Sequence, residues 1–146
     1  MHDASTDPHE LHRFIEAQDP VMDTVLRELG QGRKQTHWMW FVFPQLKGLG
    51  SSEMAKRYAI SSLAEARAFL LHPILGPRLT QCVQTLLMHP RASAIDIFGE
   101  LDSLKLRSCL TLFYLSAPDE ALFETALHRF FNGTLDEKTV RSVSSY

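Results

Sequence analysis

The feature that most constrains the fold is a run of aromatic residues, His37-Trp38-Met39-Trp40-Phe41-Val42-Phe43-Pro44-Gln45. It holds both tryptophans of the chain, two residues apart. Burying one aromatic side chain contributes roughly 2–3 kcal/mol, so this run is a large term in the folding free energy. Each indole also has an N–H group that needs a hydrogen-bond partner when it is buried. The run therefore forms the centre of the core or lines a pocket, and the sequence leaves both open.

Outside this run, apolar residues recur with the period of an α-helix. The pattern predicts helices over residues 11–18, 20–29, 54–58, 62–72, 77–87, 101–115 and 119–131, with one more turn over 94–98 and a loose turn over 136–143. Gly30 is expected to end the second helix, and Ser62 with Glu65 has the spacing of a capping box. The stretch 101–115 is apolar nearly all round, which predicts a helix packed between others.

Alternation of apolar and polar residues, the mark of a half-buried strand, is missing from the chain. We interpret residues 38–43 as a short buried helix, because a lone strand cannot pair its backbone groups. The sequence thus predicts an all-α fold of about six to eight helices in one compact domain over residues 1–146. Its ordered core is expected over about 8–140, and residues 1–7 are expected to be flexible.

Several stretches carry a resemblance to a known family. They are Leu11–Pro20, the aromatic run, Gln45–Gly50, Ala55–Tyr58, His72–Gly76, and Ile97–Gly99 with Asp102, Lys105 and Ser108. Together they resemble the domain-of-unknown-function family 1810, often labelled calpastatin, over about residues 8–140. The resemblance implies a mainly helical fold and no established activity. A disordered calpain inhibitor is poor in aromatic residues, whereas this chain has nine phenylalanines, so we expect no such inhibitor.

Composition narrows the class of protein further. With 146 residues, 45% hydrophobic and 22% charged, the chain is typical of a soluble globular domain. Its net charge of −2 disfavours nucleic acid as a partner. No apolar stretch approaches the roughly 20 residues of a membrane span, and the first residues lack the pattern of a signal peptide. We therefore expect a cytoplasmic protein without a membrane partner, in which Cys82 and Cys109 are buried, reduced thiols.

Two glycine-containing basic segments flank the aromatic run. The first, residues 30–37, is neither a P-loop nor a dinucleotide fingerprint, and the simplest interpretation is a helix end followed by a solvated loop. The second, residues 47–52, precedes the helix that contains Arg57, and Ser51 or Ser52 is expected to cap that helix. Glycine for close approach, cations for charge and aromatic rings nearby would together suit a small planar anion.

Two further side chains are candidates for chemistry. Lys105 lies with Ser108 in the apolar helix, where Asp102 is a candidate partner three residues earlier; otherwise its stem is buried and its ammonium reaches water. His37 adjoins both the basic loop and the aromatic run, although a lone histidine is more often structural. The other histidines lack the spacing of metal ligands, so no metal or cofactor is predicted.

Two functions remain open. In the first, His37, Trp38, Trp40, Gln45, Arg57 and Lys105 form a pocket that binds a small anionic ligand. If that pocket is catalytic, His37 would handle protons and Arg57 or Lys105 would stabilise negative charge, but no reaction type is indicated. In the second, the aromatic segment 37–45 is partly exposed and binds another protein. Neither the identity of the ligand nor the oligomeric state follows from the sequence.

Overall fold

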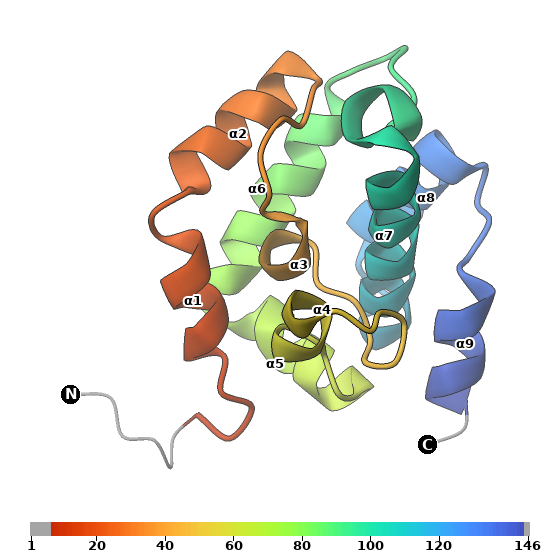
Figure 1. Ribbon diagram of the computed structural model, residues 1–146. Helices are drawn as coiled ribbons and strands as arrows, with labels where there is room; N and C mark the ends of the chain where they lie inside the picture. The colour runs from red at the N-terminus through yellow and green to blue at the C-terminus, as the bar shows by residue number, and fades with distance from the viewer. Residues whose placement is uncertain (1–6, 145–146) are drawn as a thin grey trace.

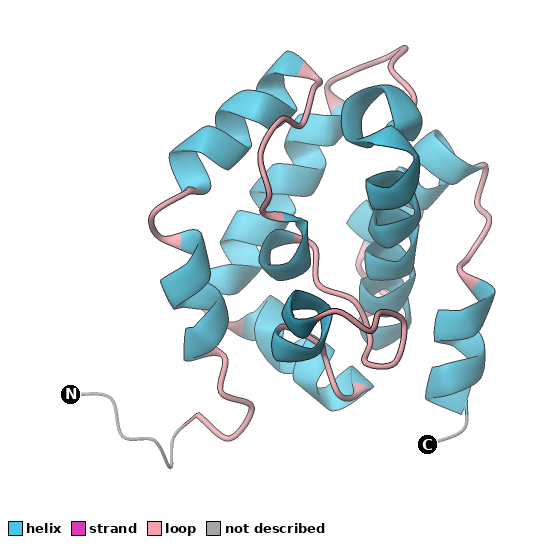
Figure 2. Cartoon of the chain, viewed as in Figure 1, coloured by secondary structure: helices cyan, strands magenta, loops and turns pink. Residues whose placement is uncertain are grey.

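A computed structural model describes residues 7–144, and this part of the chain is helical (Figures 1 and 2). Its elements are α1 (His12–Gln18), α2 (Met22–Gln31), α3 (Met39–Val42), α4 (Glu53–Arg57), α5 (Leu63–Leu71), α6 (Leu75–Leu87), α7 (Ala94–Ser116), α8 (Ala121–Phe131) and α9 (Glu137–Ser144). The all-α class is confirmed, but the described residues form nine helices rather than six to eight. The expected flexibility of residues 1–6 lies outside the described part.

The helix ends follow local signals, with small shifts. Ser62 caps α5 as predicted, its Oγ accepting the Glu65 N–H at 3.1 Å. However, α2 continues through Gly30 and ends at Gly32, whose φ of 74° lets the Arg33 N–H reach the Glu28 carbonyl oxygen. Likewise α6 begins at Leu75, two residues before the predicted Pro77, because proline is tolerated in a first turn whose N–H groups lack partners.

The longest helix, α7, joins two predicted segments. Gly99 lies inside it with φ 80° and ψ 172°, so the axis breaks there and a second segment begins at Glu100. The later part of this segment packs against α5 and α8, as expected for a helix between others. Its first turn does not, because Leu101 is 75% exposed and Leu104 is 52% exposed. The prediction of burial all round was therefore wrong for this turn.

The aromatic run forms the short buried helix that was predicted. Met39, Phe41 and Val42 in α3 are buried, and the neighbouring Trp38 and Phe43 are almost completely so. Immediately after it, a single parallel bridge joins Leu46 to Ile60, with the Ile60 N–H donating to the Gln45 carbonyl oxygen at 2.9 Å. This bridge holds the start of the loop that leads to α4.

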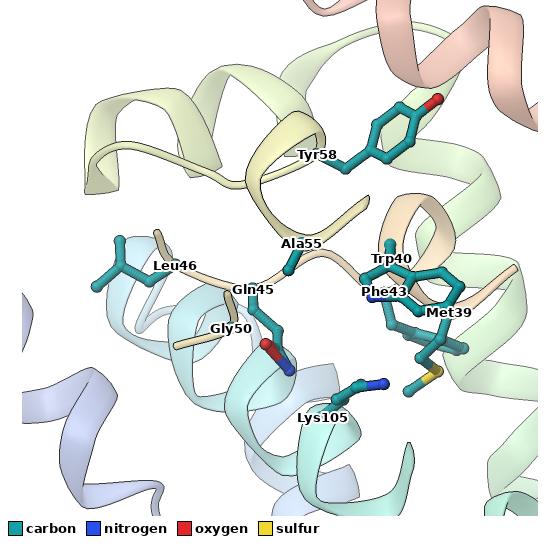
Figure 3. A pocket seen from close by; sticks show the side chains of 9 residues that line it. All are labelled: Met39, Trp40, Phe43, Gln45, Leu46, Gly50, Ala55, Tyr58 and Lys105. Atoms are coloured by element: carbon teal, nitrogen blue, oxygen red, sulfur yellow. The ribbon is translucent and has the colours of Figure 1, made fainter. Parts of the chain in front are cut away.

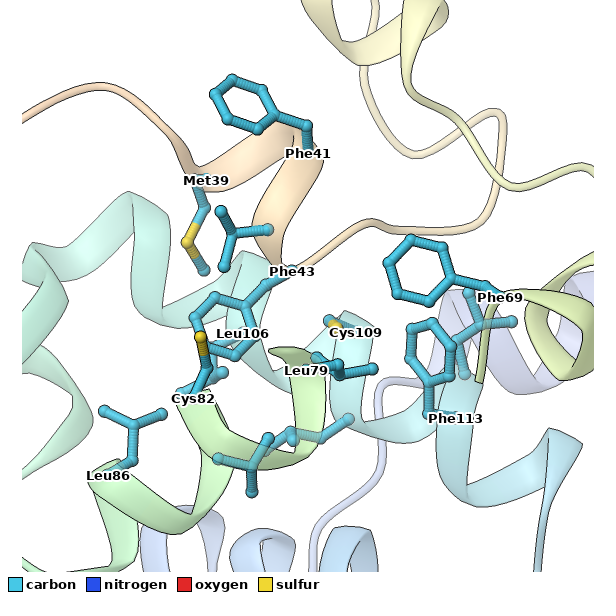
Figure 4. Packing of buried hydrophobic residues seen from close by; sticks show 14 of the residues in the cluster. Met39, Phe41, Phe43, Phe69, Leu79, Cys82, Leu86, Leu106, Cys109 and Phe113 are labelled. Atoms are coloured by element: carbon cyan, nitrogen blue, oxygen red, sulfur yellow. The ribbon is translucent and has the colours of Figure 1, made fainter. Parts of the chain in front are cut away.

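The core lies between α3 and the long helices α6 and α7 (Figure 4). Cys82 and Cys109 are buried there as free thiols, and burial raises the pKa of Cys82 to about 12 and that of Cys109 well above its ordinary value. Slow reaction of both thiols with labelling reagents is therefore expected. Among the described helices, none is both long and apolar enough to cross a membrane.

Candidate functional site

Trp38 has a complete set of partners inside the core. Its Nε1–H donates to Oε1 of Glu28 at 2.9 Å, and both side chains are 1% exposed. The same carboxylate accepts the backbone N–H groups of Gln35 and Thr36 and the Thr36 hydroxyl. Burial opposes the charge of Glu28, but these donors outweigh it and lower its pKa to about 2. Trp38 is therefore a core residue and not part of a pocket.

The lysine of the basic loop before Trp38 forms an ion pair within the protein. The Lys34 Nζ lies 2.9 Å from Oδ2 of Asp102 and 5.1 Å from the centre of the Trp38 ring. Its side chain is only 7% exposed, so this cation is not free for a ligand. The loop is solvated at Arg33 and over residues 35–37, as expected, but Lys34 ties it to α7 and is not available to an anion.

Asp102 binds a second lysine on its other oxygen. The Lys105 Nζ lies 3.1 Å from Asp102 Oδ1, as the spacing predicted, and 4.9 Å from the centre of the Trp40 ring. Burial opposes the charge of Asp102, but the two ammonium groups lower the pKa of its carboxyl. Two cations on one carboxylate leave a local charge of about +1, and Lys105 is the more exposed of them, at 30%.

Lys105 and Trp40 border two adjoining cavities, and Figure 3 shows the residues that line the inner one. The outer cavity has a volume of about 490 Å³, and the inner one, of about 10 Å³, has room for roughly one water molecule. Both are lined by Trp40, Gln45, Gly50, Ala55 and Lys105. Met39, Phe43, Leu46 and Tyr58 complete the inner cavity; Leu49, Ser51, Ser52, Leu104, Ser108, Asp136 and Lys138 complete the outer one.

Charge at the outer cavity is positive on balance. Lys105 and Lys138 line it together with one acid, Asp136. The Asp136 carboxylate accepts the N–H and hydroxyl of Thr139 at the start of α9, and it lies 4.0 Å from the Arg107 guanidinium. The Asp136 carboxylate thus already has partners within the protein, whereas the two lysines border the cavity.

Two uncommitted polar groups lie beside Lys105. Within residues 7–144, no hydrogen bond engages the side-chain amide of Gln45 or the indole N–H of Trp40. Both residues are partly exposed and line both cavities. An ammonium, an amide and an indole N–H from three segments of the chain are therefore available to one bound group.

The structure brings together three of the residues singled out from the sequence, Trp40, Gln45 and Lys105. It does not place His37 or Arg57 with them, since both are exposed and line neither cavity. Ala55 faces the cavities, and Arg57, two positions later on α4, is turned about 200° away from it. Of the six residues predicted to form one pocket, the remaining three, His37, Trp38 and Arg57, therefore lie outside it.

Sequence reasoning missed much of the cavity wall. Gly50 was noticed only as part of a glycine-containing loop, yet a Cβ atom there would lie 2.7 Å from the Ala55 Cβ. Glycine thus lets this loop approach α4 and close the cavity. Lys138 carried no signal, because it lies on α9, far along the chain. Among the described residues, no group of three or more His, Cys, Asp or Glu side chains is arranged to hold a metal ion.

Comparison with known proteins gives a family and a close structural neighbour. The profile of a family described as "Protein of unknown function (DUF1810)" matches residues 8–143. The crystal structure of the conserved hypothetical protein Rv1873 from Mycobacterium tuberculosis is similar, with a TM-score of 0.93 and 48% sequence identity. The match covers 94% of this chain and 99% of that one. No curated protein matches the chain.

Proposed function

The chain belongs to the DUF1810 family, as its sequence motifs indicated, and we propose that it binds a small anionic ligand in the outer cavity beside Trp40. The Lys105 ammonium is the main charge partner of this ligand. Gln45 and the Trp40 N–H donate the accompanying hydrogen bonds. The cavity of about 490 Å³ falls in the range of roughly 300–1,000 Å³ that is usual for small-molecule sites.

The observation that carries the proposal is that the Asp102 carboxylate binds two lysines. Lys34 occupies one carboxylate oxygen and Lys105 the other. Because Lys34 already compensates the carboxylate, the charge of Lys105 is not cancelled and can attract an anion. An ammonium has three N–H donors, and only one is needed for Asp102, so two remain for a ligand.

The alternative function, protein binding through the aromatic segment, has less support. Five of the six residues from Trp38 to Phe43 are buried, and Trp40 alone among them is partly exposed. A protein interface needs a contiguous apolar surface of several hundred Å². One half-exposed indole beside a lysine is better suited to a small ligand.

A thermal-shift screen of organic and inorganic anions tests the proposal. A ligand that binds only the native state raises the unfolding temperature by mass action. The same ligand is expected to raise it in wild type and in Lys56→Met, and not in Lys105→Met. Lys56 is a suitable control because it is exposed on α4 and lines neither cavity. Equal shifts in wild type and Lys105→Met, or no shift with any anion, would overturn the proposal.

A further inference from the structure

The outer cavity is much larger than an inorganic anion requires. A cavity of roughly 10–15 Å³ on the same measure holds one water molecule, and this one measures about 490 Å³. The donors of Lys105, Gln45 and Trp40 come from one part of its wall, shared with the small inner cavity. A ligand that fills the site must therefore have a body beyond its charged group.

Of the five polar residues on the remaining wall, Ser51 and Lys138 are exposed and have no side-chain hydrogen bond within the described part of the chain, whereas the other three are already engaged. The Ser108 hydroxyl donates to the Leu104 carbonyl oxygen at 3.1 Å, and the Ser52 Oγ accepts the Ala55 N–H at 3.1 Å. Asp136 is engaged by Thr139, as described above. Three of the polar residues on the wall thus already serve the protein.

The apolar residues on this wall, in contrast, have side-chain surface that no other described residue covers. Leu104 lines the cavity and is 52% exposed, and Leu49 lines it from the loop before α4. One turn before Leu104 on α7, Leu101 is 75% exposed. A single exposed leucine is common, but Leu101 and Leu104 lie one turn apart on α7 and form an apolar strip, of which Leu104 borders the cavity next to Lys105.

From this arrangement we infer that the ligand is an amphipathic organic anion. Its anionic head lies at Lys105, Gln45 and Trp40, and its apolar body lies along Leu104 and Leu49. This inference rests on the proposed function and specifies the chemistry of the ligand. A sugar phosphate is also an anion, but its body is rich in hydroxyl groups and would leave the exposed surface of Leu104 and Leu49 without an apolar partner.

Straight-chain carboxylates from acetate to octanoate test the inference directly. Each added methylene that enters the cavity is expected to tighten binding about fourfold, until the chain extends beyond Leu104. Titration calorimetry measures the dissociation constants, and quenching of tryptophan fluorescence gives a second readout. Trp40→Phe assigns the quenching, since Trp38 is then the sole tryptophan and is buried away from the cavity.

Leu104→Ser is expected to reduce the fourfold step to less than twofold while weak binding of acetate persists. Ile95→Ser is the matched control, because Ile95 lies on the same helix with similar exposure, 57%, and lines neither cavity. Circular dichroism checks that both variants fold, and Leu104→Ala provides a second truncation should Leu104→Ser fail to fold.

The outcomes separate this inference from the proposed function. Affinity independent of chain length, but still lost in Lys105→Met, would overturn the amphipathic ligand and leave the anion site standing. Tighter binding of ribose 5-phosphate than of octanoate would likewise overturn the amphipathic ligand and leave the anion site standing. If none of the carboxylates binds while the thermal-shift screen finds another anion that depends on Lys105, the inference again fails alone. If neither experiment finds an anion, both proposals fail together.

Discussion

Trp38 and Trp40 each lie beside a lysine and yet have opposite roles. Each indole lies about 5 Å from a lysine ammonium, and both lysines bind Asp102. The difference lies in the partner of the indole N–H, which is the buried Glu28 carboxylate for Trp38 and no described residue for Trp40. One indole of the aromatic run therefore contributes its interactions to folding, and the other leaves them available at a cavity.

The largest expected effect is on folding at Trp38. Trp38→Ala removes a side chain that is 1% exposed and leaves Glu28 without one of its donors, so we expect a loss of about 3–5 kcal/mol in the free energy of unfolding. Trp40→Ala is expected to cost about 1 kcal/mol, because its ring is only partly buried. Urea denaturation measures both losses, and equal losses would contradict the different roles assigned to Trp38 and Trp40.

The second prediction concerns acid. The pKa of Glu28 is lowered to about 2 in the folded protein, against an ordinary value of 4.5, so its charge stabilises the fold above pH 4.5. This stability is lost as the pH falls from about 4.5 towards 2. We expect Glu28→Gln, less stable than wild type at neutral pH, to lose less further stability across that window.

Asp7→Asn serves as the control for the acid experiment. Burial opposes the charge of Asp7, but hydrogen bonds from the His12 ring and from the backbone of Leu11 and His12 lower its pKa to about 2. Asp7 therefore also contributes stability that is lost at low pH, but it lies far from Trp38 in the sequence. If the stability of Glu28→Gln and that of wild type depend on pH in the same way, the charge of Glu28 does not stabilise the fold around Trp38.

The third prediction compares the two lysines. Lys34→Met removes a cation that is 7% exposed and ties the loop to α7, so we expect a loss of about 1–2 kcal/mol. Lys105→Met is expected to change stability by less than about 0.5 kcal/mol, because Lys105 is 30% exposed, and to abolish anion binding. Denaturation and the anion titration distinguish them; the reverse pattern would assign the anion to Lys34.

The last prediction concerns the shape of the cavity at Gly50. Gly50→Ala places a Cβ atom 2.7 Å from that of Ala55, which forces the loop away from α4 at a cost of about 1 kcal/mol and widens the cavity at the Trp40 end. Adding Ala55→Gly removes the clash. The double variant is therefore expected to recover the anion affinity that Gly50→Ala loses, whereas additive losses would show that the loop does not shape the site.

Much of the fold was predictable because its signals are local. The buried helix over residues 39–42, the Ser62 cap and the break at Gly99 all depend on residues within one or two helical turns. The site was only partly predictable. Trp40, Gln45 and Lys105 line the same cavities, and their role in binding stays a prediction; Trp38 was grouped with them because neighbouring aromatic residues look alike in a sequence.

The sequence by itself determined a helical chain with an aromatic core segment and membership of the DUF1810 family. Only the tertiary structure decided which indole is satisfied and which lines the cavity, and that Asp102 binds both Lys34 and Lys105. The reason is physical: helical periodicity and caps arise from neighbours along the chain, whereas this site joins Lys105 to side chains sixty or more positions away. Such side chains meet only through the packing of α3, α4 and α7, which no local pattern encodes.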